Sequence, residues 1–275
     1  MNDLTPIAGA RGRDILRKRG IYVPPAYTNL RIAQNPSALL QATSVDASGK
    51  TQYHYTKKQD LKRSRKKWEQ TSRFVQAIPA IRGEAKRMLK AADPRERAIA
   101  IGVTLMDRCG FRVGGTTEAT GVTTLEQKHV GKRTIAFLGK SAVRNVCQVD
   151  PAFAALVRKH YVPYKPSRHD LNEFLQTFGE GFSCKDYRTF RANAVFLEST
   201  LRGDAPKTAL EAAAASIHNT PTICKGNYLV PILYASVAAG KVPRPLANGV
   251  GKYATQGENL FASTIKKYIL KETTK

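Results

Sequence analysis

The chain has 275 residues, of which 45 are Lys or Arg and 21 are Asp or Glu, giving a formal net charge of +24. No apolar run approaches the roughly 20 residues of a membrane span, and the N-terminus lacks the apolar core of a signal peptide, so the sequence excludes both classes and predicts an intracellular protein. The charge excess favours a polyanionic partner, nucleic acid, over a merely basic soluble protein.

The first quarter of the chain predicts a small β-rich domain. Apolar or β-branched stretches at 21–23 and 30–33 suggest strands, and residues 39–45 and 51–56 flank the turn sequence Asp46-Ala47-Ser48-Gly49 as a hairpin. Seven basic residues and one acid follow in KKQDLKRSRKK, where the pattern becomes helical. Residues 57–77 are therefore predicted to form an amphipathic helix that ends the first domain, 1–77, and bridges to the second.

The remainder, 78–275, predicts a larger, mainly α-helical domain. Pro94 after Asp93 is a helix-start signal. Strands are predicted at 122–125, 133–138 and 143–149, the last two forming a hairpin with Gly139-Lys140-Ser141 at its tip. The fold class is thus α+β. The predicted helices span 80–91, 94–108, 151–160, 168–178, 184–201, 205–217 and 256–271.

Several familiar catalytic signatures are missing from the sequence. It has no Walker P-loop, no HExxH and no carboxylate cluster for two-metal chemistry, so no metal site is predicted. What remains is a set of isolated polar residues in small polar contexts. They are Arg112 in CGFRVGG, Lys140 in FLGKSA, Lys185 and Arg188 in SCKDYRTF, and Tyr228 in NTPTICKGNY.

These residue types suit metal-free phosphoryl transfer. Tyrosine can be the nucleophile, provided that cations assist the loss of its proton. Arginine makes charge-assisted bidentate hydrogen bonds to phosphate, and lysine can donate a proton to a leaving oxygen. Taken singly, each residue has a simpler interpretation: Arg112 as one more surface arginine, Lys140 as a hairpin-tip lysine, and Tyr228 as a core tyrosine.

The order and surroundings of these residues resemble the type IB DNA topoisomerases, in particular the compact poxvirus-like and bacterial branch. Residues 23–32, VPPAYTNLRI, resemble the opening segment of bacterial members, and 52–55, QYHY, their following strand. RVGG to QKHV, 112–130, resembles the first catalytic-arginine block. The segment at Lys140 resembles the catalytic-lysine hairpin, KDYRT at 185–189 the second arginine block, and NTP at 219–221 through Tyr228 the nucleophile block.

The resemblance implies a role for each residue. Tyr228 would attack the scissile phosphate to form a 3′-phosphotyrosyl link, Arg112 and Arg188 would hold the non-bridging oxygens, and Lys140 would protonate the departing 5′ oxygen. Asn219 matches the fifth family position, where many members have histidine; the neighbouring His218 is the alternative, ranked lower because the block aligns without a gap on Asn219. The stretch between Arg112 and Thr123 is shorter than in relatives, which affects its DNA contacts.

The resemblance also implies a clamp around double-stranded DNA, formed by the N-terminal and catalytic domains, in a monomeric enzyme that needs no cofactor and relaxes supercoils of both signs. Most contacts would be to phosphates. The expected DNA-binding residues are Tyr53, Tyr55, Lys57, Lys58, Lys62, Arg63, Arg65, Lys66, Lys67, Lys128 and Lys185.

Two alternatives compete with this interpretation. A tyrosine site-specific recombinase shares the Arg, Lys, Arg, Tyr chemistry, but its second arginine block usually begins with histidine, where this chain has Lys185. A non-enzymatic nucleic-acid-binding protein with the same fold would have no reason to retain Arg112, Lys140, Arg188 and Tyr228 together.

The four cysteines are Cys109, Cys147, Cys184 and Cys224. They are far apart and include no CxxC pair, a pattern that fits neither a zinc site nor a disulfide framework. Free thiols are therefore expected, in a reducing compartment that contains DNA: cytoplasm or nucleoid, nucleus, or virion. Cys184 and Cys224 flank presumed active-site segments, but the expectation for them is buried, inert thiols rather than thiols whose oxidation inhibits the enzyme.

Overall fold

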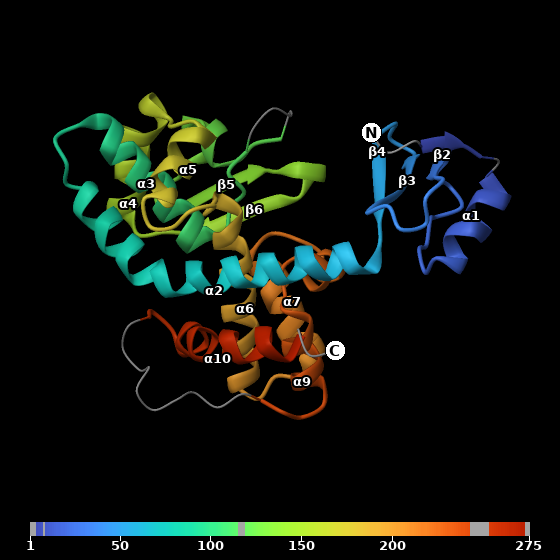
Figure 1. The fold of residues 1–275 in the computed structure, drawn as a ribbon. Coiled ribbons are helices and arrows are strands. Elements are labelled where there is room, and N and C mark those ends of the chain that lie inside the picture. The colour runs from blue at the N-terminus through green and yellow to red at the C-terminus, as the bar shows by residue number, and fades with distance from the viewer. Residues whose placement is uncertain (1–3, 8, 115–118, 243–252, 273–275) are drawn as a thin grey trace. The chain divides into compact units, whose positions relative to one another are not determined.

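The computed structural model describes residues 4–7, 9–114, 119–242 and 253–272, with side chains as far as residue 266 (Figure 1). The protein is α+β, with a small N-terminal sheet and a helical majority, as predicted. Two compact units divide the chain, Met1–Lys67 and Trp68–Lys275.

The first unit contains a four-stranded antiparallel sheet. Its strands β1 (Leu4–Pro6), β2 (Thr28–Ala33), β3 (Leu40–Val45) and β4 (Thr51–Tyr55) lie in chain order. The predicted hairpin between β3 and β4 is confirmed. Asp46 accepts hydrogen bonds from the backbone N–H groups of Ser48 and Lys50, and Gly49 adopts the positive φ of 79° that suits glycine.

Helix α1 (Gly9–Lys18) is absent from the sequence-based prediction, whereas residues 21–23, predicted as a strand, form none. The helix packs on the sheet through Leu16, which is buried with Leu30 and Ile32. Gly12 lies so close to the sheet that an added Cβ would be 2.4 Å from a methyl of Ile7. This close approach explains why a glycine occurs inside the helix. Glycine lowers the helix propensity of the segment, which is why the sequence did not predict a helix here.

Helix α2 (Lys57–Met88) is one continuous helix, where the sequence predicted two separated near residue 78. Pro79 lies inside it and has no N–H to donate to the carbonyl of Val75, four residues earlier. The hydroxyl of Tyr253 donates to that carbonyl instead, at 3.0 Å. A contact 178 residues away in sequence therefore satisfies the group that the proline leaves unpaired, and the helix continues.

The second unit is built around helix α6 (Cys184–Leu201), which contacts α3 (Pro94–Cys109), α5 (Arg168–Gln176), α7 (Pro206–Ser216) and α10 (Gln256–Glu272). Its Tyr187, Phe190 and Phe196 belong to the main hydrophobic core. A helix buried on most sides in this way is apolar around much of its circumference. The predicted helices are confirmed within a few residues, with the one at 151–160 present as α4 (Pro151–Leu156) continued by a π-helix, and the structure adds α8 (Pro221–Asn227) and α9 (Pro231–Ala238).

The predicted hairpin of the second unit is present as β5 (Thr134–Leu138) and β6 (Arg144–Gln148), with Lys140 at its tip. The predicted strand at 122–125 is wrong: Val122–Thr124 is a 3₁₀ helix. Its β-branched residues instead lie where two segments of the chain approach each other closely, and the Thr123 N–H donates to the Val113 carbonyl at 2.7 Å. Other short helices are Gln127–His129, Lys140–Ala142, Val157–Tyr161 and Val162–Tyr164.

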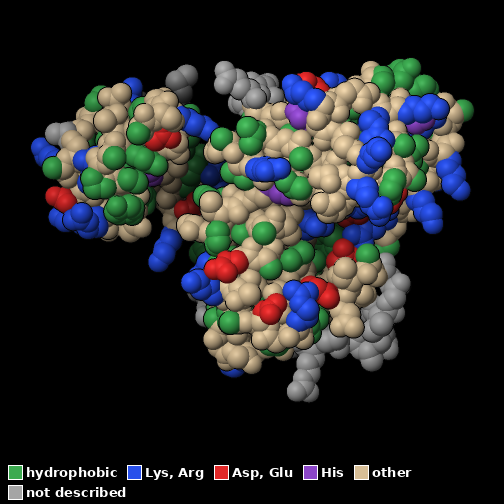
Figure 2. All heavy atoms as spheres, turned by 180° about the vertical axis from the view of Figure 1, so that it is seen from behind, with side chains coloured by type: hydrophobic (Ala, Val, Ile, Leu, Met, Phe, Trp, Pro, Cys, Tyr) green, Lys and Arg blue, Asp and Glu red, His purple; other side chains and the backbone are tan. Residues whose placement is uncertain are grey.

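The surface carries the charge excess of the sequence. Figure 2 shows basic side chains spread over much of the face that it presents, outnumbering the acidic ones. Within the described residues, no helix is both long and apolar enough to cross a bilayer.

Arg82 on α2 joins three helices through partly buried ion pairs. Its guanidinium donates to Asp107 on α3 at 2.7 and 2.9 Å and to Glu258 on α10 at 2.7 and 2.8 Å. We expect Arg82→Met to lower the free energy of unfolding by about 3 kcal/mol, because both carboxylates lose their cation. Urea unfolding measures the change. Arg87→Met, which removes a solvent-exposed partner of Glu84, is the control and should leave the midpoint unchanged.

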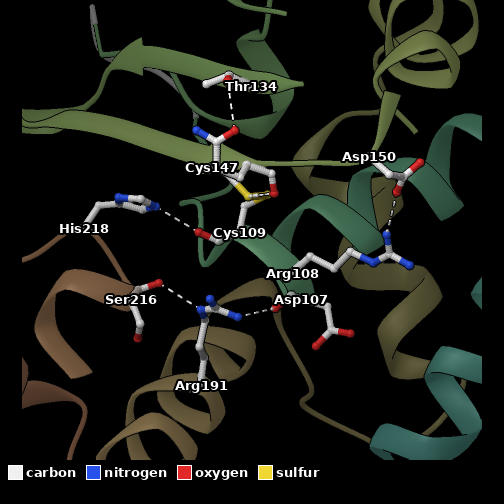
Figure 3. The surroundings of a disulfide bond; sticks show 10 residues. Asp107, Arg108, Cys109, Thr134, Cys147, Asp150, Arg191, Ser216 and His218 are labelled. Carbon is white, nitrogen blue, oxygen red and sulfur yellow. Dashed lines mark hydrogen bonds and ion pairs between the residues drawn. A yellow bond between two sulfur atoms is a disulfide. The ribbon is translucent and has the colours of Figure 1, made fainter. Parts of the chain in front are cut away.

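The expectation of four free thiols is wrong for two of them: Cys109 and Cys147 form a disulfide (Figure 3). Cys109 ends α3 and Cys147 lies on β6, 38 residues later, yet their Cα atoms are 5.4 Å apart. Sequence spacing could not reveal this pair, because only the packing of the hairpin against the end of α3 brings the two cysteines together. The disulfide also removes the basis on which a reducing compartment was predicted.

Candidate active site

Tyr228 lies at the junction of α8 and α9, held by its backbone. Thr220 caps α8 by accepting from the Ile223 N–H, and Pro221 occupies the first turn, where its missing N–H costs nothing. The side chain of Asn193 on α6 donates to the Tyr228 carbonyl at 2.8 Å and accepts from the Val230 N–H at 3.0 Å. These bonds fix where the phenol points, and the residue is 6% exposed.

Arg188 on α6 is the residue against which the phenol lies. It is 3% exposed, and its Nε donates to the Tyr228 hydroxyl at 3.4 Å while Nη1 donates to the Gly110 carbonyl at 2.6 Å. Nη2 is buried and finds no hydrogen-bond partner among the described residues. No ion pair within that part of the chain involves Arg188. A buried guanidinium without a carboxylate, and with a donor unused, is a binding position for an anion.

The surrounding cations lower the pKa of Tyr228. Burial is the largest single influence and opposes ionisation, but the charge and hydrogen bond of Arg188, with the charges of Arg112 and Lys185, together outweigh it. The pKa of Arg188 is itself lowered, because burial disfavours its charge more than Tyr228 favours it. The lowered pKa raises the fraction of Tyr228 present as tyrosinate, the nucleophilic form of a phenol, at a given pH.

Arg112 follows the C-terminal end of α3 at a sharp turn. Gly110 ends the helix with φ +63°, and an added Cβ there would be 2.2 Å from the Ser216 carbonyl oxygen. The Arg112 carbonyl accepts from the Val122 N–H at 2.9 Å. Gly121 permits this approach, since its own Cβ would be 2.4 Å from Gly114. Residues 115–118 of this loop lie outside the described residues, so the effect of its shortness on DNA contacts stays a prediction.

Lys140 projects from the tip of the β5–β6 hairpin and is exposed. Ser141 and Ala142 both have positive φ, 61° and 55°, which turns the chain tightly. The Asn145 side chain donates to the Val143 carbonyl at 2.8 Å and stands where a Cβ on Gly139 would be. The hairpin tip thus places the Lys140 side chain on a turn whose backbone is held by hydrogen bonds.

One cavity of about 570 Å³ gathers most of the predicted catalytic residues. It brings together side chains from the Arg112 loop, the hairpin tip, the start of α5, the start of α6 and the end of α8. Its lining is Arg112, Val113, Gly114, Ala119, Thr120, Lys140, Arg168, Asn172, Ser183, Cys184, Lys185, Arg188 and Tyr228. Among the residues that the structure describes, no group of three or more His, Cys, Asp or Glu side chains could hold a metal ion.

Comparison with known proteins decides the family. Residues 54–222, more than half of the chain, match the family described as the catalytic core of eukaryotic DNA topoisomerase I. The chain belongs to this topoisomerase family. The match includes Arg112, Lys140, Arg188 and Asn219, and it ends six residues before Tyr228.

Two relatives agree with this assignment. DNA topoisomerase 1B of Acanthamoeba polyphaga mimivirus is 26% identical in a match that covers 79% of this chain and 78% of that protein. The mitochondrial DNA topoisomerase I of Rattus norvegicus is 26% identical in a match that covers 50% of this chain and 27% of that protein. The enzyme is a type IB DNA topoisomerase similar to the viral one.

Arg168 and Asn172 line the topoisomerase cavity and are absent from the sequence-based prediction. Arg168 begins α5 and donates to the Gly114 carbonyl, and Asn172, one turn later, accepts from the Cys184 N–H at 3.0 Å. Ser167 caps this helix by accepting from the Asp170 N–H. This capping pattern can be recognised in the sequence and predicts where the helix begins. Only the packing of α5 against α6 shows that the first turn of α5 faces the cavity.

Asn219 and His218 take different positions. Asn219 does not line the cavity, although its Nδ2 is buried and has no partner among the described residues. His218 Nε2 lies 2.9 Å from the Cys109 carbonyl oxygen, and its ring packs on Phe111. Because a carbonyl only accepts, Nε2 carries the proton. His218 thus binds the end of α3, and of the two residues only Asn219 has a donor without a partner in the described part of the chain.

The predicted DNA-binding residues fall in four places. Tyr53 and Tyr55 lie two residues apart on β4. Tyr53 is 58% exposed, and the guanidinium carbon of Arg63 lies 3.9 Å from the centre of the Tyr55 ring. The basic residues of α2 from Lys57 to Lys66 are exposed and Lys67 is half-buried. Lys185 lines the cavity, whereas Lys128 lies outside it and pairs with Glu126 at 2.8 Å.

Cys184 and Cys224, the two free cysteines, are buried. Burial raises the pKa of each thiol to about 12. Neither is therefore a reactive thiolate near neutral pH, which agrees with the expectation of inert thiols.

The lowered pKa of Tyr228 predicts how cleavage depends on pH. Below that pKa the tyrosinate fraction rises about tenfold per pH unit, so the cleavage rate should rise and level off below about pH 10, near which an isolated tyrosine ionises. Lys185→Gln removes a cation that lowers the pKa and should move the rise to higher pH. Single-turnover cleavage at saturating DNA measures both profiles. Lys225→Gln is the charge-matched control, because Lys225 contacts the Tyr234 ring, and its profile should match the wild type.

Proposed function

We propose that this topoisomerase cuts one strand of duplex DNA by attack of Tyr228 on the scissile phosphate, and reseals it after rotation of the cut end. The observation that carries the proposal is the buried Arg188, whose Nε reaches the phenol while Nη2 has no partner in the described part of the chain. A phosphate bound at Nη2 would lie beside the tyrosine oxygen. The same guanidinium would then promote loss of the phenolic proton and stabilise the charge of the transition state.

The other cavity residues complete the proposed reaction. The Tyr228 oxygen bonds to phosphorus, and the 5′ oxygen leaves, taking a proton from Lys140. Arg112 and Arg188 bind the non-bridging oxygens. Asn219 lies outside the cavity lining, and its Nδ2, which has no partner in the described residues, would add a hydrogen bond to the phosphate. The product is a 3′-phosphotyrosyl bond and a free 5′ hydroxyl. That bond conserves the energy of the phosphodiester, so resealing needs neither ATP nor a metal ion, and supercoils of both signs are relaxed.

We propose double-stranded DNA as the partner of a monomeric enzyme working in a DNA-containing compartment. Residues 1–77 would form a DNA-binding domain with a linker helix and 78–275 the catalytic domain, together closing as a clamp. The N-terminal contacts would be those of Tyr53, Tyr55 and the exposed cations of α2. Phosphate contacts of this kind position the protein without specifying sequence.

The basic run of α2 then predicts a salt effect. Replacing Lys62 and Lys66, both exposed and one turn apart, by Gln should lower the slope of log affinity against log salt by about 0.9 for each phosphate that the variant no longer neutralises. Fluorescence anisotropy with a labelled duplex at several salt concentrations gives the slope. The same double change at Lys207 and Lys241, exposed in the second unit, should lower it less; an equal reduction would contradict a special role for the run.

Relaxation of supercoiled plasmid in EDTA without ATP tests the proposed function. Relaxation through a series of intermediate topoisomers, with protein trapped on the 3′ side of the nick by denaturant, is the expected result. Relaxation that required ATP or a divalent ion would overturn the mechanism. Strand exchange between defined sites, with no relaxation of a plasmid that lacks them, would favour the tyrosine recombinase.

A further inference from the structure

The Cys109–Cys147 disulfide closes the chain segment that contains both Arg112 and Lys140. Cys109 lies three residues before Arg112, and Cys147 lies on the strand that leads away from the Lys140 hairpin tip. Phe137 on β5 packs edge-on against Phe111, with ring centres 4.7 Å apart. The covalent bond therefore joins the base of the hairpin to the turn that presents Arg112.

That turn is also where other parts of the site converge. Arg188 donates to the Gly110 carbonyl. His218 donates to the Cys109 carbonyl, as Figure 3 shows. The segment between α7 and α8, the α6 arginine and the hairpin are thus all attached to residues 109–111. Arg188 and His218 are attached by hydrogen bonds, whereas the hairpin is attached by the disulfide. Breaking the disulfide should therefore change the position of the hairpin more than the positions of Arg188 or His218.

The two sulfur atoms differ in access. Cys109 is 2% exposed, whereas Cys147 is half-buried between the exposed residues Val146 and Gln148. Of the two cysteines, Cys147 is therefore the better placed for attack by an external thiolate at its Sγ, which makes the Cys109 sulfur the leaving group. Exchange at a disulfide depends on such access.

We propose that Cys109–Cys147 is a reversible thiol–disulfide exchange site for a dithiol reductant, and that its redox state sets the rate of DNA cleavage by fixing the Lys140 hairpin. One thiolate of the dithiol attacks the Cys147 Sγ, the S–S bond breaks, and the Cys109 sulfur leaves and takes up a proton. The second thiolate of the dithiol then attacks the resulting mixed disulfide and releases Cys147, which also takes up a proton. Two electrons and two protons pass to the protein, and the dithiol becomes a disulfide.

This inference rests on the proposed function of Lys140 as the acid for the leaving 5′ oxygen. With the disulfide intact, the hairpin is held at its base and Lys140 stays beside the phosphate site. After reduction the hairpin keeps its β5–β6 pairing but loses the bond to α3. Displacement of a catalytic group by about 1 Å can cost about 10²-fold in rate, so the reduced enzyme should cleave about tenfold to 10²-fold more slowly.

The experiment measures single-turnover covalent adduct formation on a duplex by the full-length enzyme, oxidised, reduced with dithiothreitol, and reoxidised. Alkylation with a maleimide and mass spectrometry report the redox state, and circular dichroism reports whether the reduced enzyme is folded. We expect the rate to fall on reduction and return on reoxidation, with the DNA dissociation constant unchanged. Cys147→Ser should resemble the reduced enzyme and should not respond to reductant, which excludes effects at Cys184 or Cys224.

A second substrate tests the route through Lys140. When sulfur replaces the leaving 5′ oxygen, the thiolate departs without a proton, because a thiol is far more acidic than an alcohol. Oxidised and reduced enzymes should then cleave at the same rate. An unchanged rate on the natural substrate, or the same loss on the sulfur substrate, would overturn the inference. Absence of any adduct in the oxidised enzyme would instead contradict the proposed function itself.

Discussion

Tyr228→Phe should abolish covalent attachment to DNA while leaving DNA affinity unchanged. The substitution removes the hydroxyl that Arg188 contacts at 3.4 Å and keeps the ring that fills the end of the cavity. Loss of a nucleophile in an enzyme with an intact site lowers the rate on the order of 10⁶-fold. Plasmid relaxation and denaturant-trapped adduct should both fall below detection. Binding of a labelled duplex should stay within error of the wild type, since the tyrosine is only 6% exposed and the cavity cations remain in place.

Tyr234→Phe is the matched control for this change. Tyr234 is a half-buried tyrosine on α9, packed against Phe196 and Lys225, and it does not line the cavity. Removing its hydroxyl should leave relaxation intact. Continued relaxation by Tyr228→Phe would contradict the assigned nucleophile, and loss of relaxation in both variants would point to a structural effect common to this region.

Arg188→Lys should lower the cleavage rate by about 10²- to 10³-fold, the scale for losing one transition-state donor. Lysine preserves the charge, but one ammonium on a flexible stem cannot replace a planar fork that contacts the phenol and the Gly110 carbonyl and, in the proposed complex, would also bind the phosphate. The pKa of Tyr228 should also rise, because Arg188 is the chief cation that lowers it. The rise of cleavage rate with pH should therefore move to higher pH, which a single-turnover profile will detect.

Arg191→Lys provides the control, three residues further along the same helix. Arg191 is half-buried and donates to the Ser216 and Asp107 carbonyls, as Figure 3 shows, but it does not line the cavity. Its substitution should lower thermal stability and leave the cleavage rate of the folded enzyme nearly unchanged. Equal losses of rate in the two variants would show that Arg188 acts by supporting the fold rather than by contacting the phosphate.

Local patterns predicted much of this fold. The Asp93-Pro94 pair begins α3 as expected, with the Asp93 side chain accepting from the Arg95 N–H at 2.9 Å, and the turn at Asp46 joins β3 to β4. Signals of this kind depend on residues within a few positions of each other, so they are legible without tertiary structure. Helix α1 escaped prediction because its glycine, which weakens the local signal, is there for contact with the sheet.

The residues of the cavity were also predicted largely by type and order. Isolated cations in polar contexts and one tyrosine suit phosphoryl transfer, and the resemblance to type IB topoisomerases singled them out. The structure brings Arg112, Lys140, Lys185, Arg188 and Tyr228 to a single cavity. Arg168 and Asn172 could not be predicted in the same way. Nothing in their neighbourhood distinguishes them from surface residues of a capped helix, and the packing of α5 on α6 alone turns them inward.

The sequence by itself determined most of the helices, the two hairpins, the basic character and the chemical types from which the site is built, because each follows from neighbouring residues or from composition. Tertiary structure alone decided the continuity of α2 across Pro79, the Cys109–Cys147 bond and the lowered pKa of Tyr228. Each of these depends on a partner distant in sequence, or on the balance between burial and the charges that the fold gathers around one group. Neither the contact with a distant partner nor this balance of burial and charge exists until the chain has packed.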